Sequence, residues 1–246
     1  MLRRLAVGAG IALAAAAGTS GAARGFPVFG AGCMRADFRS AGTTVRAERC
    51  GPASGQRAVI VLHGCGGFGT FDHTLAVDLP RFGIATLDVD LFARTPPPGD
   101  KGFCEGFRGS PAGDPFPVWE QTAADAARSL RAHFAHVGAV GWSLGAGVAI
   151  GAAEDLQPFQ AVAAFSAFAA PDNLALAGRL PPSIFLDGGA HDIVPPANAK
   201  ELYAAARKAH VPSAVFVYRD GSHGWPGAQG AAGRRRAAAF LNRYLR

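Results

Sequence analysis

A serine stands at the centre of Gly141-Trp142-Ser143-Leu144-Gly145, which has the G-x-S-x-G pattern of a nucleophile elbow. The motif follows the apolar run at 137–141 and opens a stretch at 143–154 that is compatible with a helix. A tight turn there would expose the Ser143 hydroxyl, and the first amides of the helix would face any negative charge that develops beside it. The pattern predicts that Ser143 is a nucleophile. The alternative is a glycine-flanked turn serine without chemistry.

A serine nucleophile needs a base and an acid, and they follow it along the chain in the order serine, acid, histidine. His223 comes shortly after the last expected strand and before the last expected helix, so we predict that it is the base. His191, which follows the preceding strand, is a weaker candidate. Asp192 lies in the loop after the strand at 183–186 and is predicted as the acid, with Asp187 at the strand end as the competitor.

Acyl transfer also needs amides that bind the oxyanion. One donor is expected from Leu144, the residue after the nucleophile. The other is expected from the loop His63-Gly64-Cys65-Gly66-Gly67, which follows the first buried strand. We assign it to Cys65, with Gly66 as the alternative.

The predicted nucleophile, acid, base and oxyanion loop each follow an expected strand, and helices are expected between these strands. Short apolar runs bounded by turn residues predict strands, and longer periodic segments predict helices. The expected strands are 57–63, 84–89, 137–141, 161–165, 183–186 and 214–218, and the expected helices are 71–81, 115–134, 143–154, 197–209 and 231–245. The alternation predicts the α/β-hydrolase fold, with a mostly parallel sheet, helices on both faces, an antiparallel N-terminal hairpin over 34–39 and 43–49, and no cap domain.

The N-terminus has the pattern of a secretory signal. Arg3 and Arg4 precede an apolar run over 5–17, and small residues at 18–23 could supply a cleavage site. We therefore expect a signal peptide over 1–23, one catalytic domain over 24–246, and a periplasmic or secreted protein. An uncleaved anchor is the alternative.

Four cysteines in an exported chain indicate two disulfides. Cys33 and Cys50 bracket the expected hairpin and are predicted to pair. Cys65 would then pair with Cys104, which would fix the loop beside the predicted site. The alternative is a free, nucleophilic Cys65.

The charge pattern points away from nucleic acid. The net charge is +6, and Arg234, Arg235 and Arg236 are expected on the solvated face of the last helix, with no aromatic or Lys-rich groove. No His, Cys or Asp cluster has metal-ligand spacing, and the predicted chemistry needs no cofactor.

In its motifs and their order the chain resembles the dienelactone hydrolase family from about residue 57 to 226. The likeness rests on LHGCGGFG, on DLFAR at 90–94, on GWSLG, on the segment that ends at Pro195 and Pro196, and on SHGW. The resemblance implies a compact, lidless hydrolase of small esters or lactones, and by matching position it implies a triad of Ser143, Asp192 and His223.

Two departures bear on the substrate. Family members that act on dienelactone usually have a cysteine nucleophile, an activating Glu in the first loop, and arginines for the substrate carboxylate, one of them shortly after the base. This chain has Ser143, lacks that Glu, and has Gly-Trp-Pro-Gly after His223, although Arg94 matches the other arginine. A neutral ester fits better, in a cleft lined by Phe92, Trp142, Phe168, Ile193 and Trp225. A peptidase or acyltransferase with the same triad, or a catalytically silent binding protein, are the alternatives.

Overall fold

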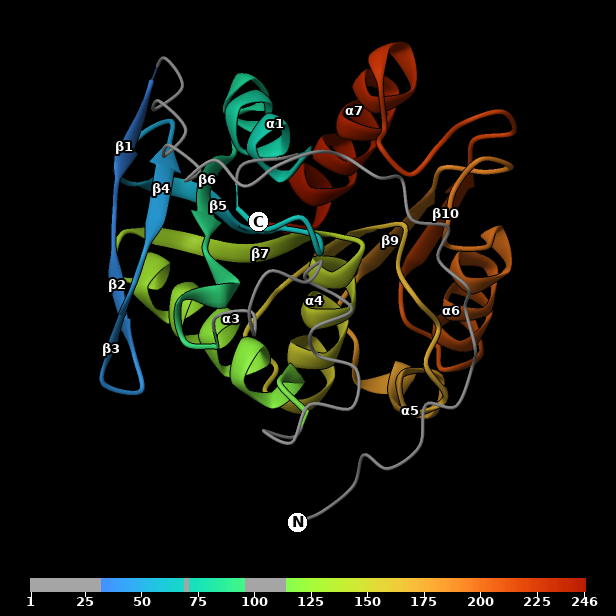
Figure 1. Ribbon diagram of the computed structural model, residues 1–246, viewed down its shortest axis with the longest axis horizontal. Coiled ribbons are helices and arrows are strands. Elements are labelled where there is room, and N and C mark those ends of the chain that lie inside the picture. Colours follow the sequence, from blue (N-terminus) through green and yellow to red (C-terminus); the bar gives the residue numbers. More distant parts are fainter. Residues whose placement is uncertain (1–31, 69–70, 96–113) are drawn as a thin grey trace, which may run out of the picture.

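The computed structural model describes residues 32–68, 71–95 and 114–246, and its centre is an eight-stranded sheet (Figure 1). The strand order is β1-β4-β6-β5-β7-β8-β9-β10, and the six strands from β6 to β10 are parallel. Their bounds are β5 Gly55–Leu62, β6 Ala85–Val89, β7 Phe134–Trp142, β8 Val162–Phe165, β9 Ser183–Asp187 and β10 Ser213–Val217. The central strands are buried along most of their length, as their unbroken apolar runs predict.

The N-terminal hairpin forms the antiparallel edge of this sheet. Its two halves, β1 (Cys33–Arg35) and β4 (Ala47–Cys50), pair with each other, and β4 pairs with β6. Between them, β2 (Phe38–Ser40) and β3 (Thr43–Val45) form a separate two-stranded sheet, so the hairpin has two parts where the sequence predicted two continuous strands. The predicted disulfide joins Cys33 to Cys50.

Helices cover both faces of the sheet (Figure 1). On one face lie α1 and α7, with a core that includes Leu75 and Leu241; on the other lie α3 to α6, with a core that includes Val148 and Leu202. The bounds are α1 Phe71–Asp78, α3 Phe116–Arg131, α4 Leu144–Asp155, α5 Pro171–Leu176, α6 Pro196–Lys208 and α7 Gly227–Tyr244. The architecture is the α/β-hydrolase fold, and no cap domain is present among the described residues.

The structure differs from the sequence-based prediction at several element boundaries, and it contains one helix, α5, that was not expected. Phe134 is the first residue of β7, although its spacing placed it on the apolar face of the preceding helix. The stretch over 166–181 contains α5, and α7 begins at Gly227, four residues before the expected start. In the part of the chain that is described, no helix is both long and apolar enough to span a bilayer.

A polar cluster lies beneath α1. Glu48 and Asp88 are directly opposite each other in β4 and β6, and both are buried. From α1, Nδ1 of His73 lies 3.7 Å from Oδ2 of Asp88 and 3.9 Å from Oε2 of Glu48. Burial raises the pKa of Asp88 to about 7, and Asp72 acts in the same direction. The proximity of Asp88 raises the pKa of His73.

These shifts predict stability that falls as pH rises. A carboxyl with a raised folded pKa favours the folded state less and less between the unfolded value near 4 and the folded value near 7. Asp88→Asn removes this loss and should raise the melting temperature by roughly 5 °C at pH 8, with little effect at pH 5. Thermal melts at both pH values would check this, with the exposed Asp172→Asn as control. A difference that does not grow with pH would contradict it.

Candidate active site

Ser143 is held in a sharp turn between β7 and α4. Its φ of 55° and ψ of −116° lie outside the regions that L-residues prefer, so the turn is strained. The backbone amide of Ser143 donates to the carbonyl of Phe165 (2.8 Å), and the carbonyl of Ser143 accepts from Ala146 and Gly147 in the first turn of α4. The hydroxyl therefore sits at the carboxyl end of the sheet and at the N-terminus of a helix.

The two glycines of the motif are required by close packing. A Cβ on Gly141 would lie 2.2 Å from the carbonyl oxygen of Gly145, and a Cβ on Gly145 would lie 2.2 Å from that of Leu62 at the end of β5. Only glycine allows the strand, the helix and the neighbouring strand to approach so closely. The pattern read from the sequence thus has a steric cause.

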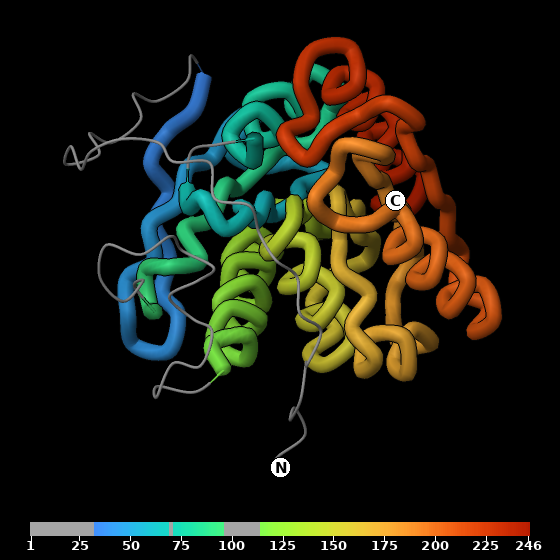
Figure 2. Tube along the Cα trace, turned by 45° about the vertical axis from the view of Figure 1, so that its right-hand side comes forward, coloured from blue at the N-terminus to red at the C-terminus, as the bar shows by residue number. Residues whose placement is uncertain are grey.

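The predicted acid and base meet in the structure. Nδ1 of His223 lies 2.6 Å from Oδ1 of Asp192, whose side chain is fully buried. A backbone bridge between His191 and Ser222 joins the two loops, which lie side by side in orange and red (Figure 2). Among the described residues, no hydrogen bond joins the competitor Asp187 to His223; one of its oxygens accepts from the amide of Gly189.

Hydrogen bonds keep Asp192 ionised. Burial opposes the charged form, but bonds from His223, from the Ser166 hydroxyl and from the Val194 amide outweigh it and hold the pKa of Asp192 below its usual value. Asp187 has the opposite balance, because burial raises its pKa to about 6. Of the two carboxyls, Asp192 is better suited to stabilise an imidazolium at neutral pH.

The imidazole lies next to the serine motif. Its ring centroid is 5.2 Å from that of Trp142, and the Trp142 indole donates to the carbonyl of His223 (3.0 Å). Among the described residues no hydrogen bond joins the Ser143 hydroxyl to Nε2 of His223. Such bonds often close only when substrate is bound.

The loop after β5 lies against Ser143. A Cβ on Gly64 would be 2.9 Å from the Trp142 ring and 3.4 Å from Cβ of Ser143. Cys65 follows, and it is disulfide-bonded; its predicted partner, Cys104, lies outside the described residues. The first turn of α4, which begins at Leu144, and the loop that contains Cys65 therefore both lie beside the nucleophile.

His63 fixes the direction of that loop. The ring is fully buried, its Nε2 accepts from the Leu91 amide (3.1 Å), and its Nδ1 lies 2.8 Å from the carbonyl oxygen of Gly64. Because Nε2 accepts, the proton is on Nδ1 and is donated to Gly64. In a trans peptide the N–H points opposite to the C=O, so the amide of Cys65 points away from His63.

The family to which the chain belongs is shown by a match to a family model. The model of the dienelactone hydrolase family matches residues 45–243, which is most of the chain. This chain belongs to the dienelactone hydrolase family. Membership makes it a carboxylic ester hydrolase. No curated protein sequence matches it.

Solved structures of two dienelactone hydrolases and of an esterase have the same fold. A Klebsiella pneumoniae protein superposes with a TM-score of 0.75 at 18% identity, covering 86% of this chain and 98% of its own. A dienelactone hydrolase from Anabaena variabilis gives 0.65 at 20% identity, covering 87% and 98%. The Pyrococcus furiosus esterase Pf2001 gives 0.68 at 16% identity, covering 87% and 93%.

The predicted substrate-binding residues of this dienelactone hydrolase family member lie in four different settings, of which the two tryptophans form the last. Phe168 and Ile193 are exposed (38% and 51%) on the loops after β8 and β9. Phe92 is buried with its ring 4.3 Å from His63. Arg94 is engaged within the fold, where its guanidinium donates to Ser40, and to Val118 and Thr122 of α3.

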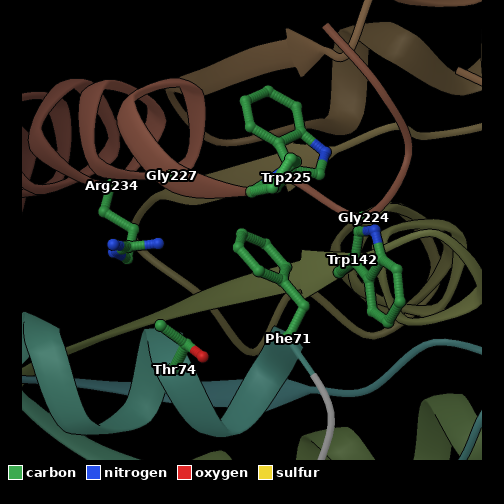
Figure 3. Close-up of a pocket in the computed structure, with 8 residues that line it drawn as sticks. Phe71, Thr74, Trp142, Gly224, Trp225, Gly227 and Arg234 are labelled. Atoms are coloured by element: carbon green, nitrogen blue, oxygen red, sulfur yellow. The ribbon is translucent and has the colours of Figure 1, made fainter. Parts of the chain in front are cut away.

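The two tryptophans line a surface pocket of about 520 Å³ (Figure 3). The rings of Trp142 and Trp225 both pack against Phe71. Arg234 from α7 lies at the opposite end of the pocket from Trp142, and its Nε is 2.7 Å from Oδ2 of Asp78. Trp225 is only 2% exposed, so it lies behind the pocket and contributes little accessible surface to it. In the described parts of the chain no group of His, Cys, Asp or Glu side chains is arranged to hold a metal ion.

One residue of the site was absent from the sequence-based prediction. Ser166, directly after β8, is fully buried and donates to Oδ2 of Asp192. The only local signal was its place at the carboxyl end of a parallel strand, where active-site residues of α/β proteins gather.

Proposed function

We propose that this chain is an exported serine hydrolase that cleaves small, neutral carboxylic esters or lactones through an acyl-enzyme intermediate. The observation that carries the proposal is the bond between Asp192 and His223 beside a serine in a strained elbow. With its proton on Nδ1, His223 leaves Nε2 free to accept the proton of Ser143. Ser143 then attacks the ester carbonyl.

The later steps use groups already described. The amides of Leu144 and Cys65 stabilise the oxyanion of the tetrahedral intermediate, and His223 passes the proton to the leaving alcohol as the acyl-enzyme forms. Water, deprotonated by His223, then attacks the acyl group, and a second tetrahedral intermediate collapses to release the acid and Ser143.

A neutral substrate agrees with the placement of the charges. The arginine expected after the base is missing, and Arg94 is bound to Ser40 and to α3. The exposed side chains of Phe168 and Ile193 offer apolar contact beside the acid and base loops. Export is supported by the leader-like segment over 1–23 and by the Cys33–Cys50 disulfide, since disulfides persist in oxidising compartments.

The test is covalent labelling combined with rapid kinetics. We expect a fluorophosphonate probe to label the folded protein on the peptide that contains Ser143, and p-nitrophenyl acetate to give a burst of p-nitrophenol equal to the enzyme concentration. Added alcohols should not capture a large share of the acyl group; if they do, the enzyme is a transferase. A folded protein that neither labels nor turns over esters would favour a binding protein.

The His63 contact yields a separate prediction. In His63→Asn the side-chain amide occupies the position of Nδ1 and can donate to Gly64, whereas in His63→Gln it reaches toward Leu91. Loss of one oxyanion donor lowers kcat by about 10²–10³-fold. We expect Gln to show most of this loss and Asn to recover at least part of it, with KM little changed. Equal kcat in both folded variants would contradict a role through Gly64.

A further inference from the structure

The carboxylate of Asp192 is bonded on every side. Oδ1 accepts from Nδ1 of His223 (2.6 Å) and from the Val194 amide (2.9 Å), while Oδ2 accepts from the Ser166 hydroxyl (2.5 Å) and from the Gly188 amide (3.0 Å). Three of these four bonds come from the loop's own backbone or from the base. The fourth comes from Ser166 in the loop after β8, and it is the only one of the four made by a side chain that the mechanism does not use.

The direction of the Ser166 bond is fixed by Trp225. Nε1 of the Trp225 indole lies 3.0 Å from Oγ of Ser166. An indole nitrogen can only donate, so Oγ accepts there and its own proton goes to Oδ2 of Asp192. Trp225 is two residues after His223. Three hydrogen bonds therefore link the side chains of Trp225, Ser166, Asp192 and His223, and the backbone from His223 to Trp225 closes the ring.

Both added members of the ring are held rigidly. Ser166 has a φ of 50°, a conformation that costs a non-glycine residue energy and persists only where the surroundings enforce it. Its amide donates to the carbonyl of Leu186 (2.7 Å). The Trp225 ring packs edge-on against Phe165, with centroids 4.9 Å apart, and is nearly parallel to the ring of Phe71 (Figure 3).

We propose that Ser166 and Trp225 are positioning residues that hold the acid and the base in register. This inference rests on the proposed function. The Ser166 hydroxyl fixes the rotation of the carboxylate, so that Oδ1 faces the imidazole, and it shares the negative charge through Oδ2. Trp225 orients that hydroxyl and ties the base loop to the same point. Among the described residues, the buried carboxyl of Asp187 interacts electrostatically with both Asp192 and His223, and the ammonium of Lys200 acts on Asp187 in turn.

The sharing of negative charge between Asp192 and Ser166 predicts the direction in which the pH profile changes when the hydroxyl is removed. Without the Ser166 hydroxyl, the negative charge of Asp192 acts more strongly on the imidazolium and stabilises it. The acidic limb of the kcat/KM profile should then move to higher pH by up to about one unit, because a bond to a charged group is of that size. A residue that only filled space would leave this limb in place.

The experiment compares Ser166→Ala, Trp225→Phe and the double variant by pH profiles, kcat and KM on a p-nitrophenyl ester. We expect kcat to fall about ten-fold in Ser166→Ala with KM little changed, and the acidic limb to rise. Trp225→Phe keeps an aromatic ring and loses the donor, so it should cause a smaller shift in the same direction. The double variant should match Ser166→Ala, since both side chains act through one bond.

The matched control is Ser183→Ala, which removes a buried serine hydroxyl that bonds only the Pro181 carbonyl at the opposite end of the sheet. It should leave the pH profile unchanged even if the protein melts earlier. An unmoved acidic limb, or additive losses in the double variant, would overturn the inference. If Ser166→Ala does not fold, Trp225→Phe alone decides it. Failure of wild-type labelling by a fluorophosphonate would refute the proposed function instead.

Discussion

Replacing Ser143 with alanine should lower kcat for a p-nitrophenyl ester by about 10⁶-fold and abolish the burst, while the fold is kept. The elbow is held by backbone bonds to Phe165 and Ala146 and by the packing of Gly141 and Gly145, none of which involves the hydroxyl. Alanine keeps the Cβ and loses only the nucleophile. Without the nucleophile no acyl-enzyme forms. The remaining rate comes from direct attack by water on a substrate whose oxyanion the amides stabilise.

Steady-state and stopped-flow assays at pH 8 would measure this loss, with circular dichroism to verify the fold. Ser129→Ala is the control, because its hydroxyl bonds only the Ala126 carbonyl within α3. That variant should retain full activity. Turnover near the wild-type rate in a folded Ser143→Ala protein would show that another group, such as a water activated by His223, performs the attack.

Much of the site could be predicted because its parts are encoded locally. The elbow needs glycines at two fixed positions, and the order of nucleophile, acid and base follows from the order of the strands. Asp192 was preferred over Asp187 because the loop after the strand can reach the histidine, and the structure places it there. Each of these inferences depended on a few neighbouring residues and on the topology of a parallel sheet.

The contacts that the sequence did not reveal depend on residues far apart in the chain. Ser166 is 26 residues from Asp192 and 59 from Trp225, and nothing near Ser166 in sequence indicates either partner. The presence of several aromatic residues near the site likewise does not indicate which rings are buried. In the structure Trp225 is buried, and its indole N–H donates to Ser166. Phe134 was misplaced because an apolar residue at a helix end has the same spacing whether the helix continues or a strand begins.

Replacing Asp192 with asparagine should lower kcat by about 10⁴-fold, and the structure gives the reason. Two donors, the Ser166 hydroxyl and the Gly188 amide, face Oδ2, whereas the Val194 amide is the one backbone donor to Oδ1, so we expect the amide oxygen of an asparagine to take the Oδ2 position. The NH₂ group then faces Nδ1 of His223 and forces it to accept. The proton moves to Nε2, which can no longer take the proton of Ser143.

The matched control is Asp187→Asn. Within the described part of the chain, Oδ1 of Asp187 accepts only from the Gly189 amide and Oδ2 has no hydrogen-bond partner. An asparagine therefore keeps the bond and removes a buried carboxyl whose pKa is raised to about 6. We expect its kcat to remain within a few-fold of the wild type and its stability at pH 8 to be equal or higher, because ionisation of the buried carboxyl no longer opposes folding. Kinetics and thermal melts of both variants would distinguish the two carboxyls. The reverse result, a large loss in Asp187→Asn and a small one in Asp192→Asn, would assign the acid to Asp187 and require the two loops to rearrange when substrate binds.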